Sequence, residues 1–593
     1  METTNANYVK GGSFLLQETE PSEIFTPEDF NEQHRMIAQT TSDFVDKEIL
    51  PRVHEIDEQQ EGLSVSLLKK AGEVGILSVD IPEEYGGLGL DKTSSMLVAE
   101  HIGRTGAWAV SHGAHTGIGT LPIVFFGTDA QKKKYLPKFA TGEWISSYSL
   151  SEAGSGSDAL AARTTAVLSP DKQNYLLNGT KMWLSNAGFA DIYITFAKID
   201  GEKFSAFIVE KRFPGVSTAA EEKKMGIKGS STRQLLLDNA KVPVENLLGE
   251  IGRGHIIAFN ILNIGRFKLG ASVIGAAKKV ISDAVVYAKT RKQFNQPIAN
   301  FGLIKQKLAD MAIRTYVGES MVYRTAGLID RMLEHVDKKS ADASKQTLKG
   351  IEEYAVECSI IKVLCSEILD FVVDEAVQIY GGYGYSEEYP VARAYRDSRI
   401  NRIFEGTNEI NRLLISGMLL KRSMKGELGL LAAAQQLANE LLSAPSGDGE
   451  SEGVFASERR LVTNAKKIAV MTSGAAAQKY MDKLNDEQEV LGRISDIVMQ
   501  VYAMESVLLR VEKNLTRNLA SDLHVNIVRT FVNDAMAQVE IYAREILPAI
   551  AEGDTLRTYL TVLKRLMKYV PLNTVVTKRA VADALIEKDR YAL

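Results

Sequence analysis

The chain has 593 residues, of which 45% are hydrophobic and 24% charged, proportions of an ordinary globular protein rather than a disordered or fibrous one. This length exceeds what one hydrophobic core usually holds, so we expect several domains. The formal net charge of −5 is small for the length and argues against a nucleic-acid-binding surface.

The first residues, METTNANYVKGGSFLLQ, lack a basic segment followed by a long apolar run, and no window is apolar enough to span a bilayer. We therefore expect a cytoplasmic protein without a secretory signal. The two cysteines, Cys358 and Cys365, lie two turns apart on an expected helix, too far for a disulfide and too few for a metal site. Two packed core thiols and no bound metal are expected.

The chain begins with an expected N-terminal extension, 1–25, and a helical domain, 26–143. DFNEQHRMIAQTTSDFVDKEILPRV repeats apolar residues at helical spacing, and Thr26-Pro27-Glu28-Asp29 is a good helix start. SHGAHTGIGT, residues 111–120, is unusually rich in small residues for a helix. Between 144 and 250, runs such as DIYITFAKID and KFSAFIVEK predict a compact β domain.

Helices return over 251–425, where AFNILNIGRFKLGASVIGAAKKVISDAVVYAKT carries many small residues that permit close helix packing. The stretch 426–453, which includes SAPSGDGESEG, is predicted to be a mobile linker, and 454–593 to be entirely helical. The predicted fold class is therefore α+β and mainly α. It comprises an N-terminal helical domain, a central β-barrel-like domain, a helical bundle and an additional C-terminal helical domain.

A glycine- and serine-rich segment, YSLSEAGSGSDALA (148–161), is the first candidate site. Gly154 to Ala159 fits GxGxxA, a pattern of nicotinamide dinucleotide sites, but that pattern must open a helix after a strand. RTTAVLSPDKQNYLLNG follows instead and predicts a strand and a turn. The N–H groups and hydroxyls of Ser151, Gly154, Ser155 and Ser157 can form a nest for phosphate or a flavin edge, with a plain structural loop as the alternative.

Further residues each leave two interpretations open. Trp183, in KMWLSNAG, is either a core tryptophan or a flat wall for a flat ring, with the Ser185 hydroxyl beside it. The pair Gly381-Gly382 makes a plain turn or lets the backbone approach a ligand closely. Arg266 and Arg291, taken alone, are most simply solvated charges.

One isolated acid, Glu405, stands in NRIFEGTNEI between the ring of Phe404 and the flexible pair Gly406-Thr407. It is either a helix-start acid or a carboxylate kept for chemistry.

Seven motifs, in this order, make residues 25–420 resemble the acyl-CoA dehydrogenase family: IPEEYGGLGL, SLSEAGSGSD, KMWLSNAG, MGIKGSSTRQL, RKQFNQPI, QIYGGYGYSEEYPVARAYRD and RIFEGTNEINR. ILNIGRF, NFGLIKQKLADM and the extra C-terminal domain are most similar to its very-long-chain branch. Beyond about residue 425 only the all-helical character supports the resemblance.

The resemblance implies an enzyme that uses FAD to oxidise a long-chain fatty acyl-CoA to the trans-2-enoyl-CoA, the first step of fatty acid β-oxidation. In that family a carboxylate removes the α-proton while the β-hydrogen leaves as hydride to flavin N5. The matching motif makes Glu405 the base, with Phe404 keeping it dry and basic. Some members place the base one residue before the arginine matching Arg266, but that position here is Gly265.

The resemblance also implies ligand contacts. The FAD positions are Tyr148, Leu150, Ser151, Ser157, Trp183, Ser185, Arg291, Phe294, Gln378, Gly381, Gly382, Thr407 and Glu409. The substrate positions are Ser157, Arg266, Phe404 and Gly406. Arg291, Phe294, Gln378, Gly381 and Gly382 would grip the dinucleotide half, in the family often from a neighbouring subunit. The family commonly has Gln after the residue matching Phe301, so Gly302 puts one flavin contact in doubt.

Chain length and partners are further expectations. Small residues at Gly113, Ala114, Gly117 and Gly119 would leave a deep cavity for a long acyl tail. We expect a homodimer and electron-transfer flavoprotein as the electron acceptor.

Membrane contact is expected to be weak and peripheral at most, because Asp448, Glu450 and Glu452 in the linker would be repelled by anionic lipids. Two alternatives stay open: an acyl-CoA oxidase that uses oxygen, and a non-catalytic assembly or scaffold protein of the same fold.

Overall fold

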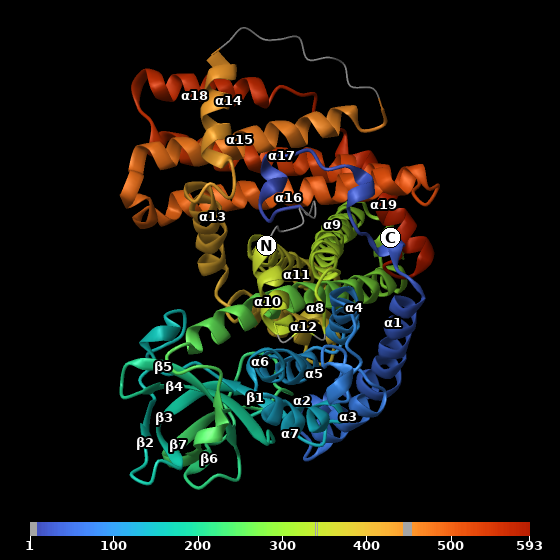
Figure 1. The fold of residues 1–593 in the computed structure, drawn as a ribbon. Coiled ribbons are helices and arrows are strands. Elements are labelled where there is room, and N and C mark those ends of the chain that lie inside the picture. The colour runs from blue at the N-terminus through green and yellow to red at the C-terminus, as the bar shows by residue number, and fades with distance from the viewer. Residues whose placement is uncertain (1–8, 339, 341, 443–452) are drawn as a thin grey trace.

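The computed structural model describes residues 9–338, 340, 342–442 and 453–593. It confirms a mainly helical chain with one central sheet domain. Figure 1 shows the N-terminal helices and the sheet at one end, a helical bundle across the middle, and the C-terminal helices at the other end. None of the described helices is long and apolar enough to cross a membrane.

The N-terminal helices are short: the first packs on the fourth, the fourth packs on the helical bundle, and the sixth contacts the last strand of the sheet. They are α1 (Glu32–Phe44), α2 (Val53–Asp57), α3 (Leu63–Glu73), α4 (Lys92–Gly103), α5 (Ala107–Gly113), α6 (Leu121–Phe126) and α7 (Asp129–Ala140). The first helix begins later than expected, because Thr26 caps only the 3-10 turn Pro27–Asp29 and Asn31 caps α1. The small residues after α5 form a wide π-helical turn, Ala114–Gly119.

The sheet domain holds strands β1 (Ser146–Ser149), β2 (Thr165–Leu168), β3 (Asn174–Ser185), β4 (Ile192–Ile199), β5 (Lys203–Glu210), β6 (Val216–Thr218), β7 (Thr232–Pro243) and β8 (Leu247–Leu248). Their order is β6-β7-β3-β2-β4-β5-β8, and β1 pairs in parallel with β4. The β3–β7 register shifts between Lys181 and Leu184, so β3 bulges next to Trp183.

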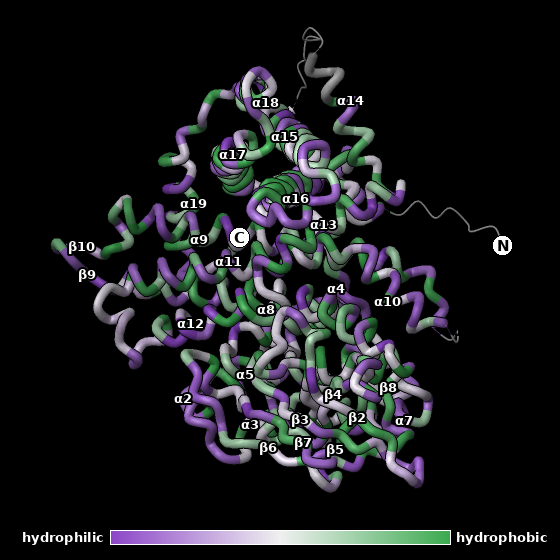
Figure 2. Tube along the Cα trace, turned by 90° about the vertical axis from the view of Figure 1, so that its left-hand side faces the viewer, coloured by the Kyte–Doolittle hydropathy of each residue, from purple (hydrophilic) through white to green (hydrophobic). Residues whose placement is uncertain are grey.

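The bundle consists of α8 (Gly254–Thr290), α9 (Gly302–Leu333), α10 (Ala343–Glu353), α11 (Ala355–Tyr380), α12 (Pro390–Ser398) and α13 (Asn408–Met424). A hairpin of β9 (Lys292–Gln293) and β10 (Gln296–Pro297) joins α8 to α9 and projects from one side in Figure 2. The predicted close packing is confirmed at Gly275, where a Cβ would strike the Glu100 carbonyl of α4. Cys358 and Cys365 are buried, free thiols of α11.

Every regular element in the described C-terminal residues, 453–593, is a helix, as predicted. Its helices are α15 (Ala456–Tyr480), α16 (Gln488–Thr516), α17 (Asp522–Ile550), α18 (Gly553–Leu566) and α19 (Thr574–Lys588). The expected linker also contains a helix, α14 (Leu430–Leu442), because LLAAAQQLANELL consists of strong helix formers and buries Leu430 and Leu437. Asp448, Glu450 and Glu452 lie outside the described residues.

The described part of the expected N-terminal extension is tied to the C-terminal helices and to the bundle. Phe14 and Leu15 are buried, and the Gly12 N–H donates to the Glu357 carboxylate of α11 at 2.7 Å. Just after the extension, Glu28 pairs with Arg510 of α16 at 2.8 Å.

Candidate active site

Glu405 stands at a sharp reversal of the chain between the 3-10 turn Arg399–Arg402 and α13. Its φ of 57° is left-handed, a conformation that a non-glycine residue adopts only when the surrounding structure demands it. Two residues later the Thr407 hydroxyl caps α13 by accepting from the Ile410 N–H at 3.2 Å. The reversal turns the Glu405 side chain away from α13 and toward α8.

The missing side chain at Gly265 makes room for this acid. A Cβ there would lie 2.8 Å from the Glu405 carboxyl carbon and closer still to Oε2. The next residue, Arg266, donates from Nε to the Glu405 carbonyl at 3.1 Å and from Nη1 to Asn263 at 2.9 Å. Arg266 is only 5% exposed, so the interpretation of it as a solvated charge is wrong.

The Glu405 carboxylate is dry and unusually basic. Its Oε2 is buried and has no hydrogen-bond partner among the described residues. Burial raises the pKa of Glu405 to about 7, against the opposing pull of the Arg266 and Lys362 charges. Lys362, whose Nζ donates to Asn408 Oδ1 at 2.7 Å, has its own pKa lowered by burial to about 8. Lys362 is not among the site residues expected from the sequence, although a single cation in the apolar run SIIKVLCSEIL indicates a buried lysine.

Two cavities meet at Phe404, Glu405 and Ser185, one of about 1580 Å³ and one of about 640 Å³. Most of the predicted ligand positions line the larger one: Tyr148, Leu150, Ser151, Ser157, Trp183, Ser185, Arg266, Phe404, Gly406 and Thr407. Glu409 is exposed and lines neither cavity, so of the two predicted contacts at the start of α13 only Thr407 faces this space.

Trp183 forms a wall of the larger cavity. It is 58% exposed and has a φ of 64° at the β3 bulge, which turns its ring out of the sheet core. The core interpretation of Trp183 is therefore wrong. Nearby, the Tyr148 hydroxyl is buried without a hydrogen-bond partner among the described residues, and burial raises its pKa well above the ordinary value. A flat ring next to an unpaired hydroxyl suits a flat, polar-edged ligand.

The SEAGSGSD loop does not open a helix of the dinucleotide-binding kind. It leads into a single 3-10 turn, Ala159–Ala161, and then into β2. The predicted nest is only partly formed, because Ser155 Oγ donates to the Asp158 carbonyl at 2.8 Å and closes the loop itself. Ser151 and Ser157 line the larger cavity, whereas Gly154 and Ser155 do not.

The other predicted FAD positions lie at a distant edge of the molecule. Arg291 ends α8, and 25 residues of helix separate it from Arg266, a span of about 37 Å. Phe294, at the tip of the β9–β10 hairpin, is 87% exposed, and a Cβ at Gly381 or Gly382 would meet no atom within 4 Å. Gln378 is exposed on the last turn of α11. One chain therefore does not bring this cluster to Glu405.

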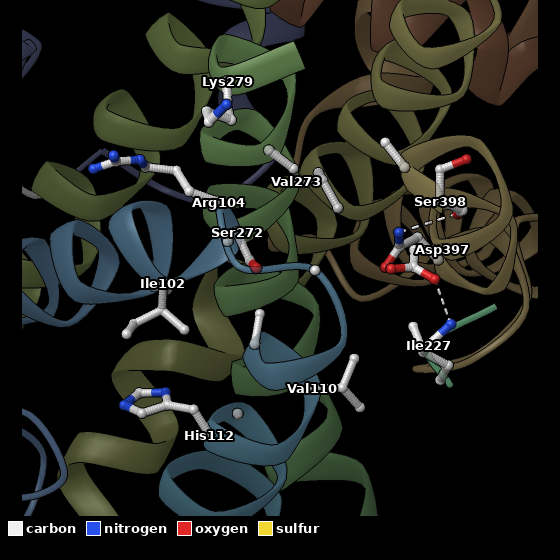
Figure 3. Close-up of a pocket in the computed structure, with 18 of the residues that line it drawn as sticks. Ile102, Arg104, Val110, His112, Ile227, Ser272, Val273, Lys279, Asp397 and Ser398 are labelled. Carbon is white, nitrogen blue, oxygen red and sulfur yellow. Dashed lines mark hydrogen bonds between the residues drawn. The ribbon is translucent and has the colours of Figure 1, made fainter. Parts of the chain in front are cut away.

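The smaller cavity is lined by Glu405 and by residues of α4, α5, α8 and α12. Figure 3 shows Ile102, Val110, Val273 and Asp397, one from each of these helices, around it. Ile102, Val110 and Val273 give it apolar surface, and a side chain at Gly113 would enter open space. Ala114 and Gly117 also line it, but a side chain at Gly119 would strike Ser146, so that predicted position is wrong.

A polar group interrupts the apolar wall of the smaller cavity. The Lys268 ammonium there pairs with Asp80 at 2.6 Å. His112 stays neutral because burial, reinforced by the Lys268 charge, lowers its pKa to about 3. Charged side chains also line other parts of this cavity, among them Arg104, Lys279 and Asp397. The apolar wall of Ile102, Val110 and Val273 is the part that suits an acyl chain.

Four sequence families of acyl-CoA dehydrogenase domains match the chain: the N-terminal domain at 31–143, the middle domain at 147–240, and two C-terminal domains at 252–420 and 464–565. A probable acyl-CoA dehydrogenase of Bacillus subtilis is 52% identical over 99% of each chain. The very long-chain specific acyl-CoA dehydrogenase of rat mitochondria is 38% identical, over 78% of this chain and 72% of its own. A crystal structure of an acyl-CoA dehydrogenase complexed with FAD, from Bacillus anthracis, has a TM-score of 0.96 and 53% identity and covers 99% of this chain.

Replacing Glu405 by Gln should stabilise the protein above neutral pH. The folded-state pKa of about 7 lies above the ordinary 4.5, so folding is opposed once the carboxylate must ionise inside. We expect the melting temperature of E405Q to exceed the parent's at pH 8 by about 1–2 °C, equivalent to roughly 1–3 kcal/mol for a chain of this length. The difference should shrink as the pH falls and vanish below about pH 4, where both the folded and the unfolded parent carry a protonated Glu405. Equal melting temperatures at pH 8 would contradict the burial of an ionised group.

Proposed function

The chain belongs to the acyl-CoA dehydrogenase family, and we propose that it uses FAD to oxidise long-chain fatty acyl-CoA to trans-2-enoyl-CoA, the first step of fatty acid β-oxidation. The observation that carries the proposal is Glu405, a dry carboxylate with a pKa of about 7 at the junction of two cavities. A non-catalytic scaffold protein would have no use for a buried, unpaired carboxylate, because burying such a group lowers the stability of the fold.

The larger cavity suits the flavin. Trp183 offers a flat face, Tyr148 an unpaired hydroxyl, and Thr407 stands at the N-terminus of α13, where peptide dipoles favour anionic groups. Ser151 and Ser185 add hydroxyls at its rim. When bound, FAD supplies the acceptor for the hydride that leaves the β-carbon.

The proton is removed by Glu405. Its Oε2 takes the α-proton, a step that needs a desolvated base because the α-proton of a thioester is a very weak acid. The Glu405 N–H makes no hydrogen bond to another described residue and is free to donate to the thioester carbonyl, where negative charge develops. Gly406 keeps the approach to this N–H open, and Arg266 fixes the loop by holding the Glu405 carbonyl.

The substrate occupies both cavities in this proposal. The acyl chain enters the smaller one past Phe404, displaces water and keeps Glu405 dry, while the CoA portion leaves through the larger one past Ser157. The open space at Gly113 extends the tail cavity and favours long chains.

Two copies complete the site. Arg291 lies about 37 Å along α8 from Arg266, which contacts Glu405, so we propose that the cluster of Arg291, Phe294, Gln378, Gly381 and Gly382 serves the FAD of a second copy. Exposed Phe294, together with Tyr385 at 89% and Leu303 at 74% exposure, gives the apolar surface expected of such an interface. We propose a homodimer, with electron-transfer flavoprotein as the acceptor of electrons from the reduced flavin.

Glu405→Gln should abolish reduction of the flavin by substrate. With palmitoyl-CoA added anaerobically, the parent's yellow spectrum should bleach, and E405Q should bleach slower by about 10²–10⁴-fold, the usual worth of a general base. Glu202→Gln, at an exposed acid between β4 and β5 that lines neither cavity, is the control and should behave as the parent. A colourless parent that binds no FAD, or E405Q bleaching at the parental rate, would refute the proposal. Rapid peroxide formation in air without added acceptor would favour an oxidase.

The pH dependence should report Glu405. The base must be ionised, so kcat/KM should rise with pH through about 7 and level off above it. Lys362→Met removes a positive charge that lowers the pKa of Glu405, so the rising limb should move to higher pH. Lys345→Met, at an exposed lysine of α10, should leave the profile unchanged. An unshifted limb in K362M would remove Lys362 from the site.

Gly113→Leu should shorten the tail cavity. Because a side chain there enters open space, activity on palmitoyl-CoA should fall by about tenfold or more while activity on butyryl-CoA changes little. Gly417→Leu on α13 also points into open space but lies outside both cavities, so it controls for the larger helix side chain. A parent enzyme most active on butyryl-CoA and inactive on palmitoyl-CoA would contradict the long-chain assignment.

A further inference from the structure

The last helix, α19, is held firmly against the bundle. It packs on α9 and α17, and Figures 1 and 2 both place it beside α9. Lys578 of α19 pairs with Asp310 of α9 and with Asp534 of α17, each at 2.9 Å. Lys305 of α9 in turn pairs with Asp583 of α19. Side chains of α19 are therefore presented at a fixed place beside the start of α9.

Arg579 is the side chain that α19 brings to the start of α9. Its Nη2 would lie 3.5 Å from a Cβ at Gly302, so the guanidinium stands over the position where the chain has no side chain. Gly302 follows Phe301, whose ring meets that of Phe294 edge-on with centroids 6.0 Å apart. Arg579 thus joins the edge that carries the distant FAD positions.

The charge of Arg579 has no acidic partner. Among the described residues it forms no ion pair, while the adjacent Lys578 forms two. Arg291 at the same edge also lacks a paired acid and lies over the Tyr383 ring at 5.3 Å. A single exposed arginine is ordinarily just solvated. Here two unneutralised guanidinium groups flank an exposed phenylalanine.

That combination fits a dinucleotide. Guanidinium groups bind phosphate oxygens in a bidentate manner, and an exposed ring stacks on a base. Phe294 and Asn295 have left-handed φ values of 51° and 62°, as the two-residue turn of the β9–β10 hairpin requires, and this turn presents the Phe294 ring at the hairpin tip. We propose that Arg579 of α19 binds the diphosphate of the FAD held across the dimer, in place of the side chain absent at Gly302. This inference rests on the proposed FAD site.

The test measures FAD binding to apoprotein by flavin fluorescence, together with the FAD-to-protein ratio of the purified enzyme. Arg579→Gln should raise the dissociation constant of FAD by about tenfold or more, as should Arg291→Gln. Arg579→Lys should recover part of the loss, because charge remains without the bidentate geometry. Arg557→Gln, at an exposed arginine of α18, is the matched control and should bind FAD like the parent.

A second arm separates contact from folding. If Arg579 replaces a side chain at 302, Gly302→Gln should restore part of the FAD affinity in the Arg579→Gln background, while the apoprotein melting temperature stays at the parental value. If Arg579→Gln binds FAD as tightly as the parent while Arg291→Gln binds it more weakly, Arg579 is not part of the FAD site, although the rest of the proposed site stands. A parent protein that binds no FAD would instead refute the proposed function.

Discussion

The site depends on an absent side chain. Glu405 occupies the space that any Cβ at Gly265 would take, so its Oε2 lies against the backbone of α8, buried and without a hydrogen-bond partner among the described residues. Burial raises the pKa of Glu405, and the Arg266 and Lys362 charges oppose that rise, which leaves the pKa at about 7. The same Arg266 fixes the loop through the Glu405 carbonyl, so position and basicity share one cause.

Three residues that line the larger cavity have a left-handed backbone conformation. Trp183, Ile227 and Glu405 all have left-handed φ values, between 46° and 64°, and all border the larger cavity. Each such residue costs roughly 1 kcal/mol or more, and persists because its neighbours leave no alternative. At Trp183 the neighbour is the β3–β7 ladder, and at Glu405 it is the cap of α13 and the Arg266 hydrogen bond. The sheet on one side and α13 on the other therefore hold the Trp183 ring and the Glu405 side chain in the wall of the larger cavity.

The amino-acid sequence alone predicted the regular helices and strands, which apolar spacing reveals, and the catalytic acid, which lies in a recognisable motif. The long α8, the strands around 192–210 and the helical C-terminal part follow directly from apolar spacing, and Glu405 from its motif. The pattern could not show that Trp183 leaves the core, because one bulge in β3 decides it, nor that Ser155 closes its own loop. Lys362 and Arg579 escaped because their roles arise from neighbours more than forty residues away, and no local pattern records those contacts.

A network of buried charges ties the C-terminal helices to the bundle that carries the site. Arg510 of α16 pairs with Glu319 of α9 at 2.7 Å. Lys278 of α8 also pairs with Glu319, and it pairs with Glu100 of α4 at 2.6 Å. The cost of removing these four charges from water largely offsets their mutual attraction, so the network adds little net stability. Separating the helices would leave a buried charge without its partner, so one relative position of these helices is strongly favoured. Because α8 carries Gly265 and Arg266 near one end and Arg291 just past the other, fixing α8 against α16 sets both halves of the proposed FAD site at once.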